Sequence, residues 1–141
     1  MTNLGSILYE LNPAGPLNLS SCLETAGHPA RTYVLTILST GQLQIAFDGG
    51  HQVVWTSTNP PCSPSSNISC RIQAGVIYLS SNGSDYAQSN NTVMPNPSCL
   101  VLTASGHAQI APAPANPTAA AALVANGCPN PAWDDGGFTQ I

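Results

Sequence analysis

The chain contains very little charge. It has no lysine and only two arginines, Arg31 and Arg71, among its 141 residues, and its charged fraction is 6%, against roughly 25% in typical soluble proteins. A protein that binds nucleic acid needs a row of basic side chains to neutralise phosphates. The net charge of −4 is also too small and too scattered to steer a charged partner. We therefore exclude nucleic acid as a partner.

Long apolar runs are missing too. No stretch approaches the roughly 20 apolar residues that cross a bilayer, so we expect no membrane span. Residues 1–5 lack the basic start and long apolar middle of a signal peptide, so we expect a mature chain or a fragment of a longer precursor. A length of 141 residues suits one domain with a core but not two. We predict a domain over residues 1–127 and an extended tail over residues 128–141.

Motifs of catalysis and metal binding are also absent. The sequence has no Gly-x-Ser-x-Gly elbow, phosphate-binding loop or nucleophilic cysteine context. His28, His51 and His107 lie near glycines in predicted turns or strand starts, without the His or Cys spacing of a zinc site. The acidic segment 134–136 hints at calcium, but no later glutamate completes a calcium loop. We predict a non-catalytic protein with no metal and no other cofactor.

What the sequence does contain is strand-like alternation. Apolar residues from Leu43 to Phe47 alternate with small or polar ones, which is typical of a strand with one buried face. An Asp-Gly-Gly sequence at 48–50 then allows a tight reversal. The return strand ends at Trp55, so residues 33–59 predict a β-hairpin.

Part of this hairpin recurs along the chain. Residues 41–46 and 106–111 share the pattern Gly-x-x-Gln-Ile-Ala, and residues 75–80 fit it more loosely. The second unit has its own turn signal at 81–84. Similar units at a regular spacing predict an all-β fold built three times.

The cysteines suggest a cross-link. Five are present, and Cys62 and Cys70 flank a proline-rich loop in which a bridge would close only a short segment. We predict a Cys62–Cys70 disulfide, the alternative being a more distant partner for Cys70. The pairing of Cys22, Cys99 and Cys128 stays open. The odd cysteine would bond to another chain or to a missing precursor segment.

Glycosylation would compensate for the uncharged surface. Asn-x-Ser/Thr acceptor triplets begin at Asn18, Asn67, Asn82 and Asn90, in stretches that resemble loops or strand ends. Together with the cysteines and the low charge, these triplets predict an extracellular, secreted glycoprotein.

The composition changes after Ile110. An Ala-Pro segment at 111–117 precedes four alanines. This region is either a long loop that leads to a last strand at Leu123-Val124, or a short helix over residues 118–124, which the alanines favour. The tail that follows contains Trp133 and Phe138. We expect these aromatic residues to dock on their own domain or on a neighbour.

With its three units laid out, the chain resembles the bulb-type mannose-binding lectins of monocots. The resemblance rests on the opening run at 7–9, on the Trp-Thr-Ser-Thr-Asn ending at 55–59 and on the position of Cys70, and it covers roughly the first four-fifths of the chain. It implies a β-prism II of three antiparallel four-stranded sheets with pseudo-threefold symmetry.

The resemblance also implies one buried tryptophan from each unit. Trp55 matches in the first unit and Tyr86 is a stand-in in the second. In the third unit the position is filled only if Trp133 of the tail folds back.

The sugar site of that family is a Gln, Asp, Asn, Val and Tyr motif at every second position of one strand in each unit, so that all five side chains lie on one face. The matching positions are Leu38, Thr40, Gln42, Gln44 and Ala46 in the first unit, Ile72, Ala74, Val76, Tyr78 and Ser80 in the second, and Thr103, Ser105, His107, Gln109 and Ala111 in the third. The motif is degenerate in every unit. A site without its Asp and Asn loses hydrogen bonds worth about 1 kcal/mol or more each, so mannose binding by the family's mechanism is not supported.

Two functions therefore compete. In the first, which explains the missing lysines, the odd cysteine and the aromatic tail, the chain is a structural or assembly subunit of an extracellular matrix or fibre. Its partners would be copies of itself or other extracellular chains, with covalent N-linked glycans and O-linked sugars on residues 111–117. In the second, it binds carbohydrate through an altered, non-mannose site. The candidate residues for that site are Gln42, Gln44, Tyr78, His107 and Gln109.

Overall fold

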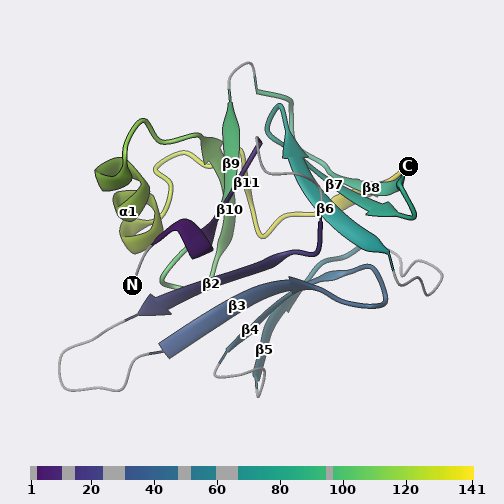
Figure 1. Ribbon diagram of the computed structural model, residues 1–141, viewed down its shortest axis with the longest axis horizontal. Helices are drawn as coiled ribbons and strands as arrows, with labels where there is room; N and C mark the ends of the chain where they lie inside the picture. Colours follow the sequence, from purple (N-terminus) through teal and green to yellow (C-terminus); the bar gives the residue numbers. More distant parts are fainter. Residues whose placement is uncertain (1–2, 11–14, 24–30, 48–51, 60–66, 95–96) are drawn as a thin grey trace.

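The strands form three antiparallel four-stranded sheets (Figure 1). The computed structural model describes residues 3–10, 15–23, 31–47, 52–59, 67–94 and 97–141. In chain order its elements are the 3₁₀ helix η1 (Asn3–Ser6), β1 (Ile7–Tyr9), β2 (Asn18–Leu23), β3 (Arg31–Ile37), β4 (Leu43–Phe47), β5 (Gln52–Thr56), β6 (Ile68–Gln73), β7 (Val76–Ser81), β8 (Ser84–Ser89), β9 (Ser98–Leu102), β10 (Ala108–Pro112), the helix α1 (Pro117–Asn126), β11 (Trp133–Asp134) and β12 (Phe138–Gln140).

Each sheet contains one of the three predicted units. Sheet A has the strand order β1-β9-β10-β11, sheet B has β12-β8-β7-β6, and sheet C has β2-β3-β4-β5. The repeated segments lie in β4, in β7 and at the start of β10. The predicted all-β fold, a β-prism of three four-stranded sheets, is confirmed.

Residues with positive φ close the hairpins of sheet B. Asn82 and Gly83, with φ of 52° and 83°, connect β7 to β8, as the turn signal at 81–84 predicts. Ala74 and Gly75, with φ of 51° and 77°, connect β6 to β7 in the same way. Two successive positive φ values give the turn that matches the twist of two-residue hairpins. The turn predicted at 48–50 lies outside the described residues.

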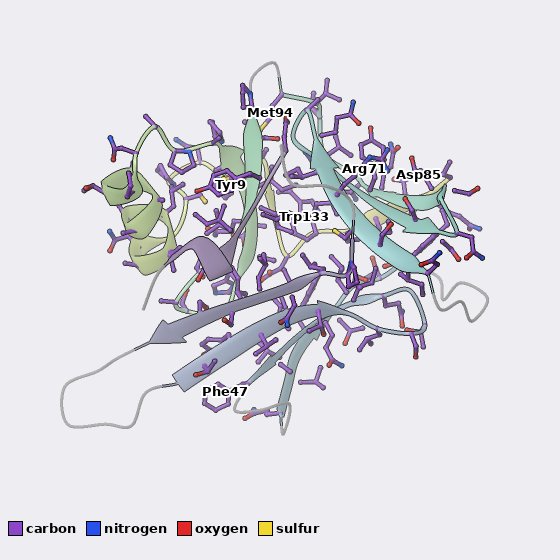
Figure 2. All side chains as sticks on the ribbon, viewed as in Figure 1. Tyr9, Phe47, Arg71, Asp85, Met94 and Trp133 are labelled. Carbon is purple, nitrogen blue, oxygen red and sulfur yellow. The ribbon has the colours of Figure 1, made fainter. Side chains whose placement is uncertain are left out.

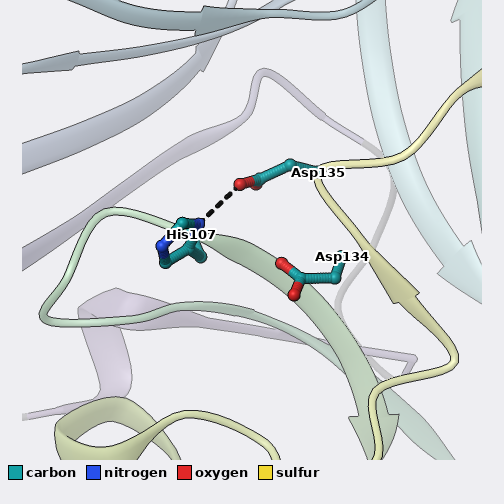
Figure 3. A group of neighbouring side chains, drawn as sticks. All are labelled: His107, Asp134 and Asp135. Carbon is teal, nitrogen blue, oxygen red and sulfur yellow. Dashed lines mark hydrogen bonds and ion pairs between the residues drawn. The ribbon is translucent and has the colours of Figure 1, made fainter.

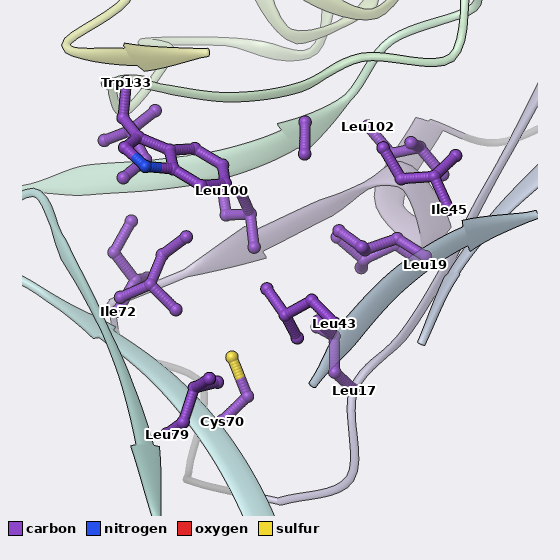
Figure 4. Close-up of a cluster of buried hydrophobic side chains, with 14 of the residues drawn as sticks. Leu17, Leu19, Leu43, Ile45, Cys70, Ile72, Leu79, Leu100, Leu102 and Trp133 are labelled. Carbon is purple, nitrogen blue, oxygen red and sulfur yellow. The ribbon is translucent and has the colours of Figure 1, made fainter. Parts of the chain in front are cut away.

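One apolar core joins the three sheets (Figure 4). Leu43 and Ile45 are fully buried, as the alternation predicts, whereas Phe47 is half-buried near the end of β4. Each sheet contributes buried side chains to this core. They include Leu17, Leu19, Leu35, Leu43, Ile45, Cys70, Ile72, Ile77, Leu79, Leu100, Leu102, Ile110 and Trp133.

The C-terminal segment contains two short strands, and both pair within the prism. β11 completes sheet A and β12 completes sheet B. Trp133 folds back and is only 4% exposed. Its ring makes edge contacts with the rings of Trp55 and Phe138, at centroid distances of 5.7 and 5.6 Å. Residues 128–141 therefore dock on their own domain and link two of its sheets.

The region after β10 forms a helix rather than a last strand. Asn116 caps α1, since its side-chain oxygen accepts the Ala119 N–H at 2.8 Å, and Pro117 occupies the first helical position. Leu123 and Val124 therefore lie in α1, so the strand alternative is wrong. Within the described part of the chain, no helix is long and apolar enough to cross a membrane.

Candidate functional site

The outer face of sheet A is closed. Residues of β9 are buried on both sides, since Leu100 and Leu102 point into the shared core while Cys99 and Val101 join a second apolar cluster. This second cluster contains Ile7, Cys99, Val101, Ala111, Ala120, Val124 and Cys128. Because Ala120 and Val124 belong to α1, the helix covers the sheet face on which the third unit would bind a sugar (Figure 1).

This cover limits what the two third-unit candidates, Gln109 and His107, can bind. Gln109 is 8% exposed, and its side-chain oxygen accepts the Cys128 N–H at 2.8 Å. Its role in the structure is to hold the segment that follows α1. His107 is exposed directly before the start of β10. The structure therefore separates these two candidates, one buried and one in solvent.

Of the two first-unit candidates, Gln42 is tied into the protein. Its amide nitrogen donates to the backbone oxygens of Asn59 at 3.0 Å and of Ser57 at 3.4 Å. Asn59 in turn donates to the Gly41 oxygen, so these residues fix the end of the first hairpin. Gln44 is half-buried on the outer face of sheet C, opposite Thr36 and Thr56. Gln44 is thus the first-unit candidate that stays available to a ligand.

Tyr78, the candidate of the second unit, lies in a polar cluster on the outer face of sheet B. Arg71 of β6 is opposite Tyr78, and its guanidinium carbon lies 4.6 Å from the centre of the tyrosine ring. The same guanidinium pairs with Asp85 of β8 through two hydrogen bonds, Nη1 to Oδ1 at 2.7 Å and Nη2 to Oδ2 at 3.0 Å. The Ser80 hydroxyl donates to Asp85 Oδ1 at 2.5 Å. We call Arg71, Tyr78, Ser80 and Asp85 the sheet B cluster.

A β-bulge brings this cluster together. The register of β7 and β8 shifts between Leu79 and Ser80, so that Ser80 pairs with Asp85 while Leu79 still pairs with Ala87. The shift places the Asp85 carboxylate on the outer face beside Arg71. Figure 2 shows Arg71 and Asp85 on the side of sheet B that faces away from Trp133. Bulges are frequent at binding sites because they redirect a side chain in this way.

The cluster is partly open to water and fixed in charge. The Arg71 and Asp85 side chains are 31% and 29% exposed. Hydrogen bonding from Arg71 is the main cause that lowers the pKa of Asp85 below its usual value; the Ser80 hydroxyl adds to the effect, and partial burial opposes it. The same pair raises the pKa of Arg71. Asp85 is therefore an ionised acceptor at neutral pH, next to a permanent donor and an aromatic ring.

A second polar group lies where the tail meets β10 (Figure 3). His107 Nδ1 is 2.7 Å from Asp135 Oδ2, and the Ala108 N–H donates to Asp135 Oδ1 at 2.7 Å. The hydrogen bond to Asp135 is the main cause that raises the pKa of His107, and Asp134 contributes. The atoms of His107, Asp134 and Asp135 that could bind a metal ion lie within 4.8 Å of one another. Their observed contacts are those of an ion pair that fastens the tail.

The described cysteines are buried thiols. Burial raises the pKa of Cys70 and of Cys99 to about 12, and that of Cys128 to about 11. Thiols held in this neutral state are poor nucleophiles. Cys62 and the side chain of Cys22 lie outside the described residues. Because Cys62 is not among the described residues, the Cys62–Cys70 bridge stays a prediction.

The four predicted acceptor asparagines are all exposed. Asn18 begins β2, Asn67 precedes β6, Asn82 lies in the β7–β8 turn and Asn90 follows β8. The backbone N–H of Asn82 donates to the Asn67 oxygen at 3.0 Å, so these two sites are neighbours at one end of sheet B. The remaining histidines, His28 and His51, lie outside the described residues.

Sequence reasoning placed Tyr78 and Ser80 on one face of a strand but missed Arg71 and Asp85 as their neighbours. Arg71 and Asp85 are 14 positions apart in the chain, and the bulge that aligns them leaves no mark in the alternation. The available signal was scarcity. In a chain with only two arginines, one of them directly before the apolar residues of a predicted strand is unusual, and this is a reason to look for an acidic partner of Arg71.

Comparisons with known proteins agree with this fold. No protein-family model and no curated protein matches the chain. Among solved structures, it is similar to a mannose-specific lectin from Dutch crocus (Crocus vernus), with a TM-score of 0.55 and 16% sequence identity. The match covers 82% of this chain and 96% of the lectin chain. The chain thus has a lectin-like β-prism fold in which the family's sugar motifs are degenerate.

Proposed function

We propose that the protein binds carbohydrate, and that it does so on the outer face of sheet B. The observation that carries this proposal is the sheet B cluster, an ionised carboxylate, a guanidinium and an aromatic ring within contact of one another and open to solvent. Lectins recognise sugars with the same kinds of groups, since hydroxyls need directional donors and acceptors and the C–H faces of a sugar ring need an apolar surface.

Stability alone gives little reason for such a cluster. Ion pairs at the surface contribute about 0–1 kcal/mol to folding, the Arg71–Asp85 pair is partly exposed, and this chain otherwise contains very few charges. A pair that adds little to the fold, on a sheet face that faces solvent, is better explained by a ligand. The lectin-like fold supports the same reading, because the crocus protein of similar fold is mannose-specific.

A glycan array tests this proposal. We expect specific binding of at least one glycan by the wild-type protein, and loss of that signal in Tyr78→Ala. Gln44→Ala is the matched variant, because Gln44 lies on the outer face of another sheet. A wild-type protein that binds no glycan, at concentrations up to the millimolar range, would refute carbohydrate binding.

An assembly role remains a second proposal, and β5 favours it. This strand is at the edge of sheet C, and its side chains Val53 and Val54 are 53% and 48% exposed. An exposed, uncharged edge strand is a surface on which another chain adds a strand. Oligomers that are seen by light scattering and abolished by Val53→Lys would support a structural subunit of an extracellular assembly. A monomer at all concentrations would oppose it.

The assembly proposal includes an extracellular location and N-linked glycans on the chain. The exposure of all four acceptor asparagines agrees with it. Intact mass before and after enzymatic deglycosylation, without reductant and on protein from a secretory host, reports the number of glycans, the number of bridges and any covalent dimers. An unchanged mass would exclude N-glycosylation.

A further inference from the structure

We propose that His107, Asp134 and Asp135 bind a divalent transition-metal ion of the zinc class, and that this ion fastens the C-terminal segment to sheet A. These residues lie at a different sheet from the sheet B cluster, so the metal site and carbohydrate binding are independent of each other. Sequence patterns for zinc depend on ligands close together in the chain, whereas His107 and Asp135 are 28 positions apart. The sequence therefore predicts no metal although the fold brings three ligands together.

Backbone pairing fixes the three side chains relative to one another. Asp134 belongs to β11, which pairs with β10, and β10 begins directly after His107. The Asp135 N–H donates to the Ala108 oxygen at 2.9 Å. His107 is held from the other side, since its backbone N–H donates to Thr103 Oγ1 at 3.1 Å. A site on paired strands keeps its ligands in position more precisely than a site on a loop.

The possible ligand atoms are close enough for one ion. They lie within 4.8 Å of one another, and His107 Nδ1 is 2.7 Å from Asp135 Oδ2. Zinc binds histidine nitrogen and carboxylate oxygen at about 2.0–2.2 Å, so the ligand atoms of a tetrahedral site are about 3.4 Å apart. Both carboxylates point toward the His107 ring (Figure 3). Small rotations of these side chains therefore complete the coordination.

Each of the three side chains has an atom available for a metal. Asp135 Oδ1 accepts the Ala108 N–H at 2.7 Å, which orients the carboxylate, while Oδ2 faces His107. Metal-bound carboxylates commonly have such a supporting hydrogen bond. Asp134 is exposed, and among the described residues its carboxylate has no hydrogen-bond partner. An ion bound at Nδ1 takes the place of the proton between His107 and Asp135, and that proton goes to solvent.

The ligand set selects the kind of ion. Calcium prefers roughly six to eight oxygen ligands, and magnesium retains several water molecules. Imidazole nitrogen is instead typical of zinc, copper, nickel and iron sites. The two carboxylates balance the charge of a divalent ion, and three protein ligands leave one position of a tetrahedral zinc ion to water. Zinc is therefore the ion with which the site is tested.

Calorimetric titration with zinc chloride measures binding. The full chain is used without an affinity tag, after treatment with EDTA and removal of the chelator. We expect one Zn²⁺ per chain with a Kd below about 0.1 mM, and no binding of Ca²⁺ or Mg²⁺ in the same range. At a free zinc concentration of about 100 times the Kd, the folding equilibrium should shift about a hundredfold toward the native state. A rise of the thermal midpoint reports this shift.

Variants identify the ligands. Asp134→Asn removes a carboxylate that has no hydrogen-bond partner among the described residues, so the zinc-free variant should unfold like the wild type while its Kd for zinc rises at least about tenfold. His107→Gln should weaken zinc binding at least as much. Asp85→Asn is the matched control, because it removes a carboxylate from sheet B and should keep the wild-type affinity for zinc. The double variant His28→Gln/His51→Gln should keep it too.

Cobalt provides a second readout, because the visible spectrum of bound Co²⁺ distinguishes nitrogen and oxygen ligands from thiolates. We expect the spectrum of a site without sulfur. Zinc affinity that is unchanged in Asp134→Asn and His107→Gln would overturn the proposal, as would its loss in the His28→Gln/His51→Gln variant or a thiolate charge-transfer band with cobalt. A Kd above about 0.1 mM, or equal affinity for Ca²⁺ and Zn²⁺, would also refute it.

Discussion

Removal of the Trp133 side chain should destabilise the whole prism, although this residue belongs to the last ten positions of the chain. Trp133 is 4% exposed, its ring packs against Trp55 and Phe138, and its indole N–H donates to the Gly137 oxygen at 3.1 Å. Truncation of a buried tryptophan to alanine costs about 3–5 kcal/mol. This is a large part of the roughly 5–15 kcal/mol by which a domain is stable. We expect the thermal midpoint of Trp133→Ala to fall by roughly 10–20 °C.

Urea unfolding followed by far-UV circular dichroism measures this loss. Thr139→Ala is the control in the same segment, since Thr139 is exposed on β12 and its truncation should change the free energy of unfolding by no more than about 0.5 kcal/mol. The chain has two tryptophans, so emission from Trp133→Ala reports Trp55 alone. A red shift of that emission is expected, because Trp55 loses its cover. A loss of stability below about 1 kcal/mol would refute the view that residues 128–141 are part of the fold.

Three further predictions concern local features. Gly106→Ala should lower the free energy of unfolding clearly more than Gly83→Ala. Both glycines have φ above 80°, but a Cβ at Gly106 would lie 2.6 Å from the Tyr33 ring, whereas a Cβ at Gly83 would have no atom within 4 Å. Equal unfolding free energies of the two variants would contradict this prediction. Asn116→Ala should cost about 1 kcal/mol in urea unfolding through loss of the α1 cap, and no change would mean that the cap is dispensable. The hydrogen bond to Asp135 raises the pKa of His107, so we expect the wild-type protein to be more stable than His107→Gln at low pH. This difference in the free energy of unfolding should be complete below about pH 6, should disappear as the pH rises through the raised pKa, and should stay under about 1 kcal/mol because His107 is 53% exposed. A difference that grows with pH would contradict this prediction.

The fold was largely predictable because its signals are local. The alternation in β4 and the Asn-Gly turn between β7 and β8 are each encoded by a few consecutive residues, and the structure confirms both. The helix α1 was left undecided although its cap, its first-position proline and its alanines were all readable in sequence. The apolar pair Leu123-Val124 competed with those signals as a strand. Packing decided the matter, since only Val124 of that pair is fully buried against sheet A.

The site was less predictable because it depends on register. Tyr78 was identified through its position in the degenerate motif, whereas Arg71 and Asp85 lie on the two strands that flank it. Their meeting requires the hairpin pairing to be known and also the shift between Leu79 and Ser80. Gln42 and Gln109 matched the same kind of position but bond to the protein itself. A polar residue at a motif position thus indicates a ligand only when its hydrogen bonds are not already used inside the fold.

The three sheets also differ in what their outer faces can still do. A second apolar layer, formed by α1 and the segment after it, covers sheet A, so the third unit contributes stability and no ligand face. Sheet C keeps an exposed face with Gln44 but has no charged residue among its described side chains. Sheet B, among the described side chains, has an ion pair stacked on an aromatic ring on its outer face. If the proposed carbohydrate binding on sheet B holds, we therefore expect one saccharide per chain, and multivalent binding would require several copies of the chain.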